Sequence, residues 1–255
     1  MPGTKTGVGT HAWTSRTGGH LTRAETRSLL PRLAKVHAVN VVGRLAMLAH
    51  VNSGRRVLLT PAALTPPSSV LTRAAEEQAH QRLTPMLLGH SYRTYAFGMA
   101  IGTIEGVDVD TELLFAAAML HDVGLTGQRQ SSDFTLASAR AARDLAENVG
   151  LSSTATEIMR TAITMHHSPG VTLADGAVAY LLSGGAGVDV AGLKSWQLPP
   201  DVLTTVVRDW PRLGFKRGFA ELWRAEADAV PAGRARLLRR YGAFDLAVKL
   251  APFGD

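Results

Sequence analysis

Apolar residues recur three or four positions apart through most of the chain beyond residue 70, which is the spacing of helices with one buried face. Few runs alternate with a period of two, and RRVLL (55–59) is the only short strand candidate. The pattern therefore predicts an all-α fold without internal repeats. The expected helices span residues 71–82, 86–104, 111–122, 135–149, 154–167, 174–182, 201–209, 214–229 and 231–248.

The first 70 residues have a different character. Residues 1–20 are rich in Gly and Thr without an apolar period, which predicts a short irregular arm, flexible or loosely attached. Helix-like runs follow, and we expect Pro31 to break them. The stretch SGRRVLLTPAALTPPSS then indicates a loop. We therefore divide the chain into an N-terminal arm and helical extension, residues 1–70, and a main domain, residues 71–255.

Composition narrows the classes of protein. With 255 residues, 45% of them hydrophobic, the chain can bury a large core. The absence of cysteine excludes disulfides, thiolate nucleophiles and thiolate metal sites. The net charge is +6, but no basic block with interleaved aromatic residues occurs, so we expect no nucleic-acid partner. Neither a membrane span nor a signal-peptide pattern is evident, which favours a cytoplasmic protein without membrane association.

Histidine and aspartate residues form a candidate metal site. His121 and Asp122 stand together at the end of the apolar run LLFAAAMLHDVGL. Imidazole and carboxylate are donors that suit Zn²⁺ or Fe²⁺. His90 lies upstream in GHSYRTYAFGMAI, and Asp189 lies downstream in GGAGVDVAG. Taken alone, an inward-facing histidine such as His90 is often a hydrogen-bonded core residue, and Asp189 could cap the next helix. The ordered set of these residues is therefore more informative than any one of them.

The order His, His-Asp, Asp, spread over helices, resembles the HD superfamily of metal-dependent hydrolases. The segments HSYRTYAFG, DTELLFAAAMLHDVGL, AITMHHSPG, GAGVDVAG and PRLGFKRGF resemble its cyanamide-hydratase-like branch. The resemblance implies that residues 71–255 form an HD-type helical bundle and catalytic domain. It also implies one divalent metal, preferably Zn²⁺ and otherwise Fe²⁺. The implied ligands are His90, His121, Asp122 and Asp189.

The same resemblance implies further active-site residues. His166 ends a helix and faces the interior, so we expect it to act in catalysis together with Asp122. His167, one residue further on, is expected on the solvent side. A small-molecule substrate is expected to contact four residues, Tyr92, Arg93, Phe97 and Phe134. For Arg93, an ion pair with an acidic residue on a helix is an equal alternative.

The predicted function is that of a metal-dependent hydratase or hydrolase, in which metal-bound hydroxide attacks a small cyanamide- or nitrile-like substrate. Many HD phosphohydrolases carry Lys, Glu or His just after the His-Asp pair, whereas this chain has Val123 and Gly124. The branch often has an acidic residue where this chain has Thr135, which indicates a changed pocket. Two alternative functions stay open. One is an HD phosphohydrolase acting on a nucleotide or small phosphoester, and the other is a non-catalytic metal-binding domain. A two-iron oxygenase would need a second ligand set, and a homo-oligomer is left open.

Overall fold

The computed structural model describes residues 7–49, 51, 59, 64–127 and 131–255. There is no strand among these residues, which confirms the predicted all-α fold. Most of the candidate strand RRVLL and of the predicted loop around it lies outside the described residues. No described helix is both long enough and apolar enough to cross a membrane.

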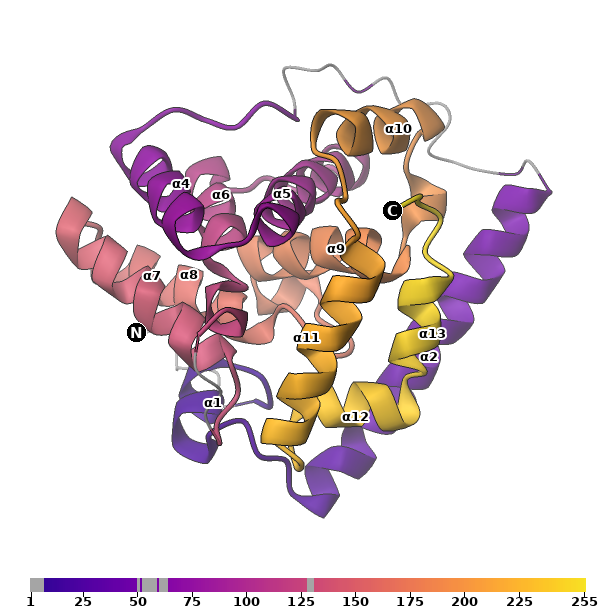
Figure 1. Ribbon diagram of the computed structural model, residues 1–255, viewed down its shortest axis with the longest axis horizontal. Coiled ribbons are helices and arrows are strands. Elements are labelled where there is room, and N and C mark those ends of the chain that lie inside the picture. The colour runs from indigo at the N-terminus through magenta and orange to yellow at the C-terminus, as the bar shows by residue number, and fades with distance from the viewer. Residues whose placement is uncertain (1–6, 50, 52–58, 60–63, 128–130) are drawn as a thin grey trace.

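The centre of the molecule is built around α6 (Thr111–Leu120), in which every residue from Leu113 to Leu120 is buried. A helix without a polar face has to be enclosed on all sides. The helices that enclose it are α4 (Val70–Arg82), α5 (Pro85–Glu105), α7 (Thr135–Val149), α8 (Ser153–Met165) and α9 (Ala177–Ala191) (Figure 1). The predicted helices at 71–82, 86–104 and 135–149 agree with α4, α5 and α7 to within one residue at either end.

Helices α5 and α9 pack closely because glycines stand where they meet. A Cβ atom at Gly185 would lie 2.0 Å from the carbonyl oxygen of Thr94, and one at Gly98 would lie 2.8 Å from that of Leu181. Both contacts are too short for any side chain, so only glycine permits this approach. The close packing brings His90 on α5 beside Asp189 on α9.

The segment before α2 is docked, so the expectation of a loose arm was wrong for residues 7–20. Helix α1 (His11–Thr17) begins at an N-cap formed by Thr10 and buries Trp13, which is 1% exposed. The indole N–H of Trp13 donates to Glu25, and the guanidinium of Arg234 lies over its ring. A buried indole with a satisfied N–H fixes the segment to the body of the protein.

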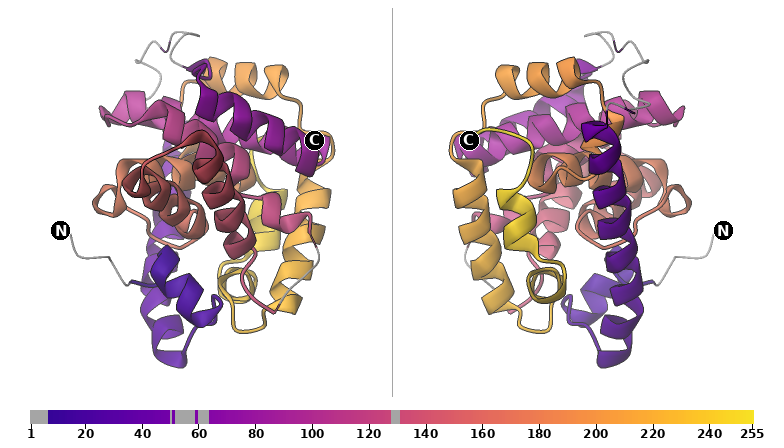
Figure 2. Two further views of the ribbon diagram at one scale, coloured as in Figure 1. Left: turned by 90° about the vertical axis from the view of Figure 1, so that its left-hand side faces the viewer. Right: turned by 90° about the vertical axis from the view of Figure 1, so that its right-hand side faces the viewer.

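Helix α2 (Arg23–Leu48) runs along one side of the molecule (Figure 2). It continues through Pro31, so the predicted break was wrong. Proline inside a helix removes one hydrogen bond and crowds the preceding turn, which costs roughly 3 kcal/mol. The side chains of Leu29 and Leu33, on either side of Pro31, pack in one buried cluster with Leu237. This packing holds the helix together across the proline.

The remaining differences concern where helices end. Helices α10 (Pro200–Asp209) and α11 (Phe215–Ala229) agree with the prediction. The single helix expected at 231–248 is two helices, α12 (Arg234–Tyr241) and α13 (Phe244–Lys249), because Ala243 between them adopts a left-handed conformation with φ of 46°. Helix α9 starts later than predicted and runs on to Ala191, so Asp189 lies within it.

Candidate metal centre

The predicted His-Asp pair lies where α6 ends. His121 is the C-cap of α6, and Asp122 precedes the short 3₁₀ turn η2 (Val123–Leu125). His166 is likewise the C-cap of α8. The C-terminal end of a helix carries partial negative charge. The two helix ends lie close together, since the rings of His121 and His166 are 4.8 Å apart between centroids, and this proximity favours a cation nearby.

Three of the four predicted ligands lie in one buried group. His90 Nε2 is 3.2 Å from His121 Nε2, and each of these atoms is 3.4 Å from Oδ2 of Asp122. Two donors bound to the same tetrahedral zinc at roughly 2.0–2.1 Å are about 3.3 Å apart. The three donor atoms are therefore spaced as the ligands of one divalent ion.

The hydrogen bonds of the two rings indicate that both Nε2 atoms carry lone pairs. Nδ1 of His121 is 2.7 Å from the carbonyl oxygen of Ala118, and Nδ1 of His90 is 2.7 Å from Oδ2 of Asp189. Each Nδ1 therefore donates a proton, which leaves each Nε2 without one in the neutral ring. Two lone pairs at 3.2 Å repel each other unless a cation lies between them.

The carboxylate of Asp122 independently indicates a cation at this place. The residue is fully buried, and neither of its oxygens accepts a hydrogen bond from the described residues. A buried carboxylate without a partner is strongly unfavourable. The histidines around Asp122 lie at 3.4–3.6 Å, which is too far for hydrogen bonds but suitable for shared coordination. These residues fit a bound divalent metal.

Asp189 lies outside this group, which differs from its predicted place as a ligand. Its Oδ2 contacts Nδ1 of His90, on the edge of the ring away from His121. Arg93 approaches the carboxylate with two nitrogens, at 2.8 and 3.0 Å, and Arg212 donates to Oδ1. The cause is the pair of buried guanidinium groups, which take the oxygens that a metal would need. Asp189 thus orients the ring of His90.

Burial and neighbouring charges act in opposite directions on these groups. Burial alone would raise the pKa of Asp189, but the charges of Arg93 and Arg212 and the contact with His90 hold the pKa well below its usual range. Burial lowers the pKa of His121. Asp189 is therefore charged at neutral pH, and the buried ring of His121 is a neutral donor.

His166 lies beside the group of three donors. Its Nε2 is 3.6 Å from Oδ1 of Asp122, and its Nδ1 is 2.7 Å from the carbonyl oxygen of Ile163. Burial first, and then the neighbouring His121, lower the pKa of His166 well below its ordinary value. Its Nε2 therefore presents a lone pair next to Asp122, where the sequence predicted a catalytic histidine.

His167 is not on the solvent side, contrary to our prediction. Its side chain is only 5% exposed, stacks on Phe134 and meets the edge of Trp223. Its Nε2 lies 3.5 Å from Oδ2 of Asp133, which is ion-paired with the buried Arg234 at 2.8 Å. The reason is that α8 ends at Met165, so the helical spacing that would turn His167 outward no longer applies.

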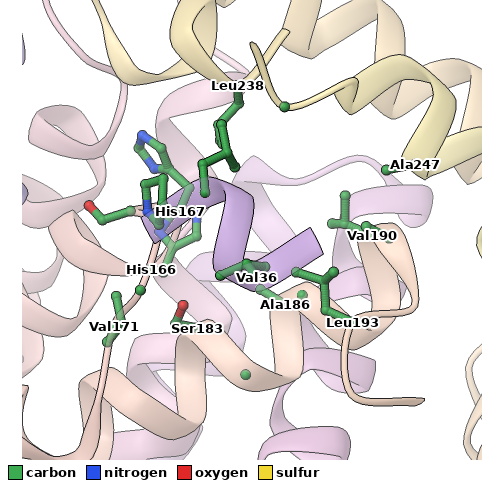
Figure 3. A pocket seen from close by; sticks show the side chains of 18 of the residues that line it. Val36, His166, His167, Val171, Ser183, Ala186, Val190, Leu193, Leu238 and Ala247 are labelled. Carbon is green, nitrogen blue, oxygen red and sulfur yellow. The ribbon is translucent and has the colours of Figure 1, made fainter. Parts of the chain in front are cut away.

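A cavity of about 680 Å³ adjoins the candidate metal centre, and His90, Asp122 and His166 line part of it. Figure 3 shows His166 and His167 at one end and Val190, Leu193 and Ala247 toward the other, with Val36 between them. Val36 belongs to α2. Sequence patterns gave no sign that this helix would form a wall of the cavity.

The four predicted substrate contacts are not among the described residues that line this cavity. Arg93 is occupied by Asp189 and by two backbone carbonyl groups. Tyr92 donates to Glu76, and Phe97 stacks on Phe253 within the core. Phe134 comes nearest, since its ring meets the edge of His166 at 5.8 Å between centroids. Their inward positions serve packing and ion pairing.

Comparison with known proteins agrees with this geometry. Residues 87–209, which include every predicted metal ligand, match the sequence model of the HD domain family. The predicted resemblance to the HD superfamily of metal-dependent hydrolases is thereby confirmed. The chain is also similar to cyanamide hydratase DDI2 and cyanamide hydratase DDI3 of Saccharomyces cerevisiae. Each is 25% identical to it over 183 residues, which cover 69% of this chain and 81% of the relative.

Proposed function

We propose that this chain is a metal-dependent hydratase that adds water to a nitrile-like group, with cyanamide as the reference substrate. The observation that supports this most is the group of His90, His121 and Asp122, whose donor atoms are spaced for one divalent ion beside a cavity. The similarity to two cyanamide hydratases supports the type of reaction.

In the proposed site His90, His121 and Asp122 hold one Zn²⁺, or alternatively one Fe²⁺. Three protein ligands are typical of catalytic zinc sites, which keep a position open. Such an ion acts as a Lewis acid and makes water a better nucleophile at neutral pH. Asp189 keeps His90 in the tautomer and orientation that present Nε2 to the ion.

The reaction adds one water across the C≡N bond. The oxygen bonds to carbon, a proton goes to nitrogen, and tautomerisation gives the amide, or urea when cyanamide reacts. We assign the proton transfer to His166, because its Nε2 carries a lone pair, lies beside Asp122 and faces the cavity. A positioned base of this kind contributes roughly 10²–10⁴ in rate.

Two features favoured the phosphohydrolase alternative, namely Arg93 as a partner for phosphate and the net charge of +6. Arg93 is fully buried and neutralises Asp189, so it is not offered to a ligand. The loss of this cationic partner weakens the phosphohydrolase alternative.

The test is to supply the purified protein with Zn²⁺ or Fe²⁺ and measure urea formed from cyanamide. We expect a rate proportional to metal content and no activity in Asp122→Asn. Hydrolysis of phosphomonoesters without any hydration of cyanamide or nitriles would assign the site to phosphate chemistry instead.

We further propose that residues 71–255 are the catalytic domain, with the extension 1–70 supplying α2 to the cavity wall. A cytoplasmic location remains a prediction from the sequence.

A further inference from the structure

The cavity is much larger than cyanamide. Pockets of roughly 300–1,000 Å³ enclose most of a drug-sized ligand, and this cavity measures about 680 Å³. At roughly 30 Å³ for each water, that space equals about twenty water molecules. A linear molecule a few atoms long would leave most of the space filled with water. The size therefore indicates a larger substrate.

The wall away from the metal centre is mainly apolar, although His37, Asn40 and Ser183 also line the cavity. Its apolar part comes from four helices and a loop, namely Val36, Ala186, Val190, Leu193, Leu238 and Ala247 (Figure 3). The cationic residues that border the cavity are exposed or paired: Arg32 and Lys35 are exposed on α2, and Lys194 is paired with Glu105 at 2.9 Å. Such a wall favours an uncharged apolar group over water.

The apolar wall and the metal centre belong to one continuous cavity, since His90, Asp122 and His166 line it as well. A compound whose reacting group reaches Asp122 and His166 therefore has the rest of its body against the apolar wall. The two parts of the cavity therefore differ in role, because one end holds the candidate metal ligands and the other offers mainly apolar contact area.

Helix α2 holds its part of the wall in place from both ends. Near its start, Leu33 packs in the cluster with Leu237. Near its end, Arg44 donates to the carbonyl oxygens of Ala191 and Leu250, at 2.8 and 3.1 Å. A wall that is formed before binding requires little ordering when a ligand enters.

We infer that the substrate is a neutral alkyl or aryl-alkyl nitrile, whose apolar body lies between α2 and α9 while its C≡N group reaches Asp122 and His166. The inference rests on the proposed function and names the substrate class of the same site. Free cyanamide is then a poor substrate that lacks the body which the cavity binds.

Turnover tests the inference directly. In the metal-loaded enzyme, kcat/KM should rise about fourfold for each methylene along the series from acetonitrile to hexanenitrile. It should be higher still for 4-phenylbutyronitrile. Val36→Trp fills the cavity and should lower kcat/KM for 4-phenylbutyronitrile at least tenfold more than for cyanamide. Val42→Trp is the matched control, since Val42 lies on the same helix but is 66% exposed, and it should leave the ratio unchanged. Ala247→Phe, on α13, narrows the cavity from another wall if Val36→Trp fails to fold.

Binding separates this inference from the proposed reaction. Calorimetric titration of the metal-free protein with 4-phenylbutyramide should show binding that Val36→Trp weakens and Val42→Trp does not. If that binding occurs but no nitrile or cyanamide is hydrated, the apolar ligand class stands and the proposed reaction is wrong. Equal kcat/KM for cyanamide and 4-phenylbutyronitrile, with no binding of the amide, would overturn the inference while leaving hydration intact.

Discussion

Nδ1 of His90 lies 2.7 Å from Oδ2 of Asp189, and this contact decides what each side chain does. It leaves Nε2 of His90 as the atom that faces His121 and Asp122. It also keeps Asp189 on the opposite edge of the ring, where Arg93 and Arg212 neutralise its charge. A carboxylate in that position would strengthen the imidazole as a donor from outside the group of ligands.

Asp189→Asn should therefore weaken zinc binding by roughly 10- to 100-fold rather than abolish it. The amide keeps an oxygen that can accept from His90, but it loses the negative charge. Competition with a chelator measures the affinity, and circular dichroism checks that the helices are intact. Complete loss of zinc from a folded Asp189→Asn protein, equal to that of Asp122→Asn, would make Asp189 a ligand.

His166→Ala should keep its metal and its helical content, while turnover of the best nitrile substrate falls by roughly 10²–10⁴. The reason is that His166 lies beside the three closely spaced donors and is not one of them. Metal analysis and kinetics on the same preparation check both parts. Normal turnover in His166→Ala would return this histidine to a packing role, and loss of metal would make it a ligand.

The ion pair of Asp133 and Arg234 should be a major contributor to stability. Both side chains are almost fully buried, and their atoms lie 2.8 Å apart. Asp133→Asn leaves a buried guanidinium without its counter-charge, so we expect a loss of roughly 3–5 kcal/mol in the free energy of unfolding. Asp144→Asn breaks the solvent-exposed pair with Arg143 and should have little effect on stability. Denaturant unfolding of both variants makes the comparison, and similar losses would contradict it.

The stabilising effect of Asp133 should also depend on pH. Burial acts to raise its pKa, but the charges of Arg234 and His167 outweigh burial and hold the pKa far below the usual value. Since the folded pKa is lower than the unfolded value of about 3.9, the contribution is fully present above the unfolded pKa. It is lost as the pH falls from there toward the folded pKa. The difference in unfolding free energy between wild type and Asp133→Asn should thus be constant from pH 7 to about 5 and shrink below about 4. A difference that does not change down to pH 3 would rule this out.

The helices followed from apolar spacing, which is a local signal, whereas the grouping of His90, His121 and Asp122 was implied by the resemblance to the HD superfamily. The ion pairs of Asp189 could not be predicted from the sequence. They depend on Arg212, whose side chain reaches Asp189 from the loop between α10 and α11. Arg93 was expected near the site from its spacing to His90, but that spacing says nothing about which charge it meets, and in the structure it pairs with Asp189.

The composition of the cavity wall was even harder to predict from the sequence. Val36 reaches the cavity only because α2 continues through Pro31 and is tied to residues far along the chain, such as Ala191. Propensity and periodicity describe neighbours within one helix, whereas this wall comes from packing between distant segments. His167 was misplaced for a related reason, since the helical period ends with α8 at Met165.

The most direct test of the central claim is elemental analysis of the purified protein and three variants. Wild type should carry about one equivalent of Zn or Fe, and His121→Ala and Asp122→Ala should lose it, because the remaining donors cannot close the site. His20→Ala is the control, since His20 is exposed and distant in sequence from the candidate centre, and it should keep the metal. Full metal content in His121→Ala and Asp122→Ala would contradict the assignment of the metal centre.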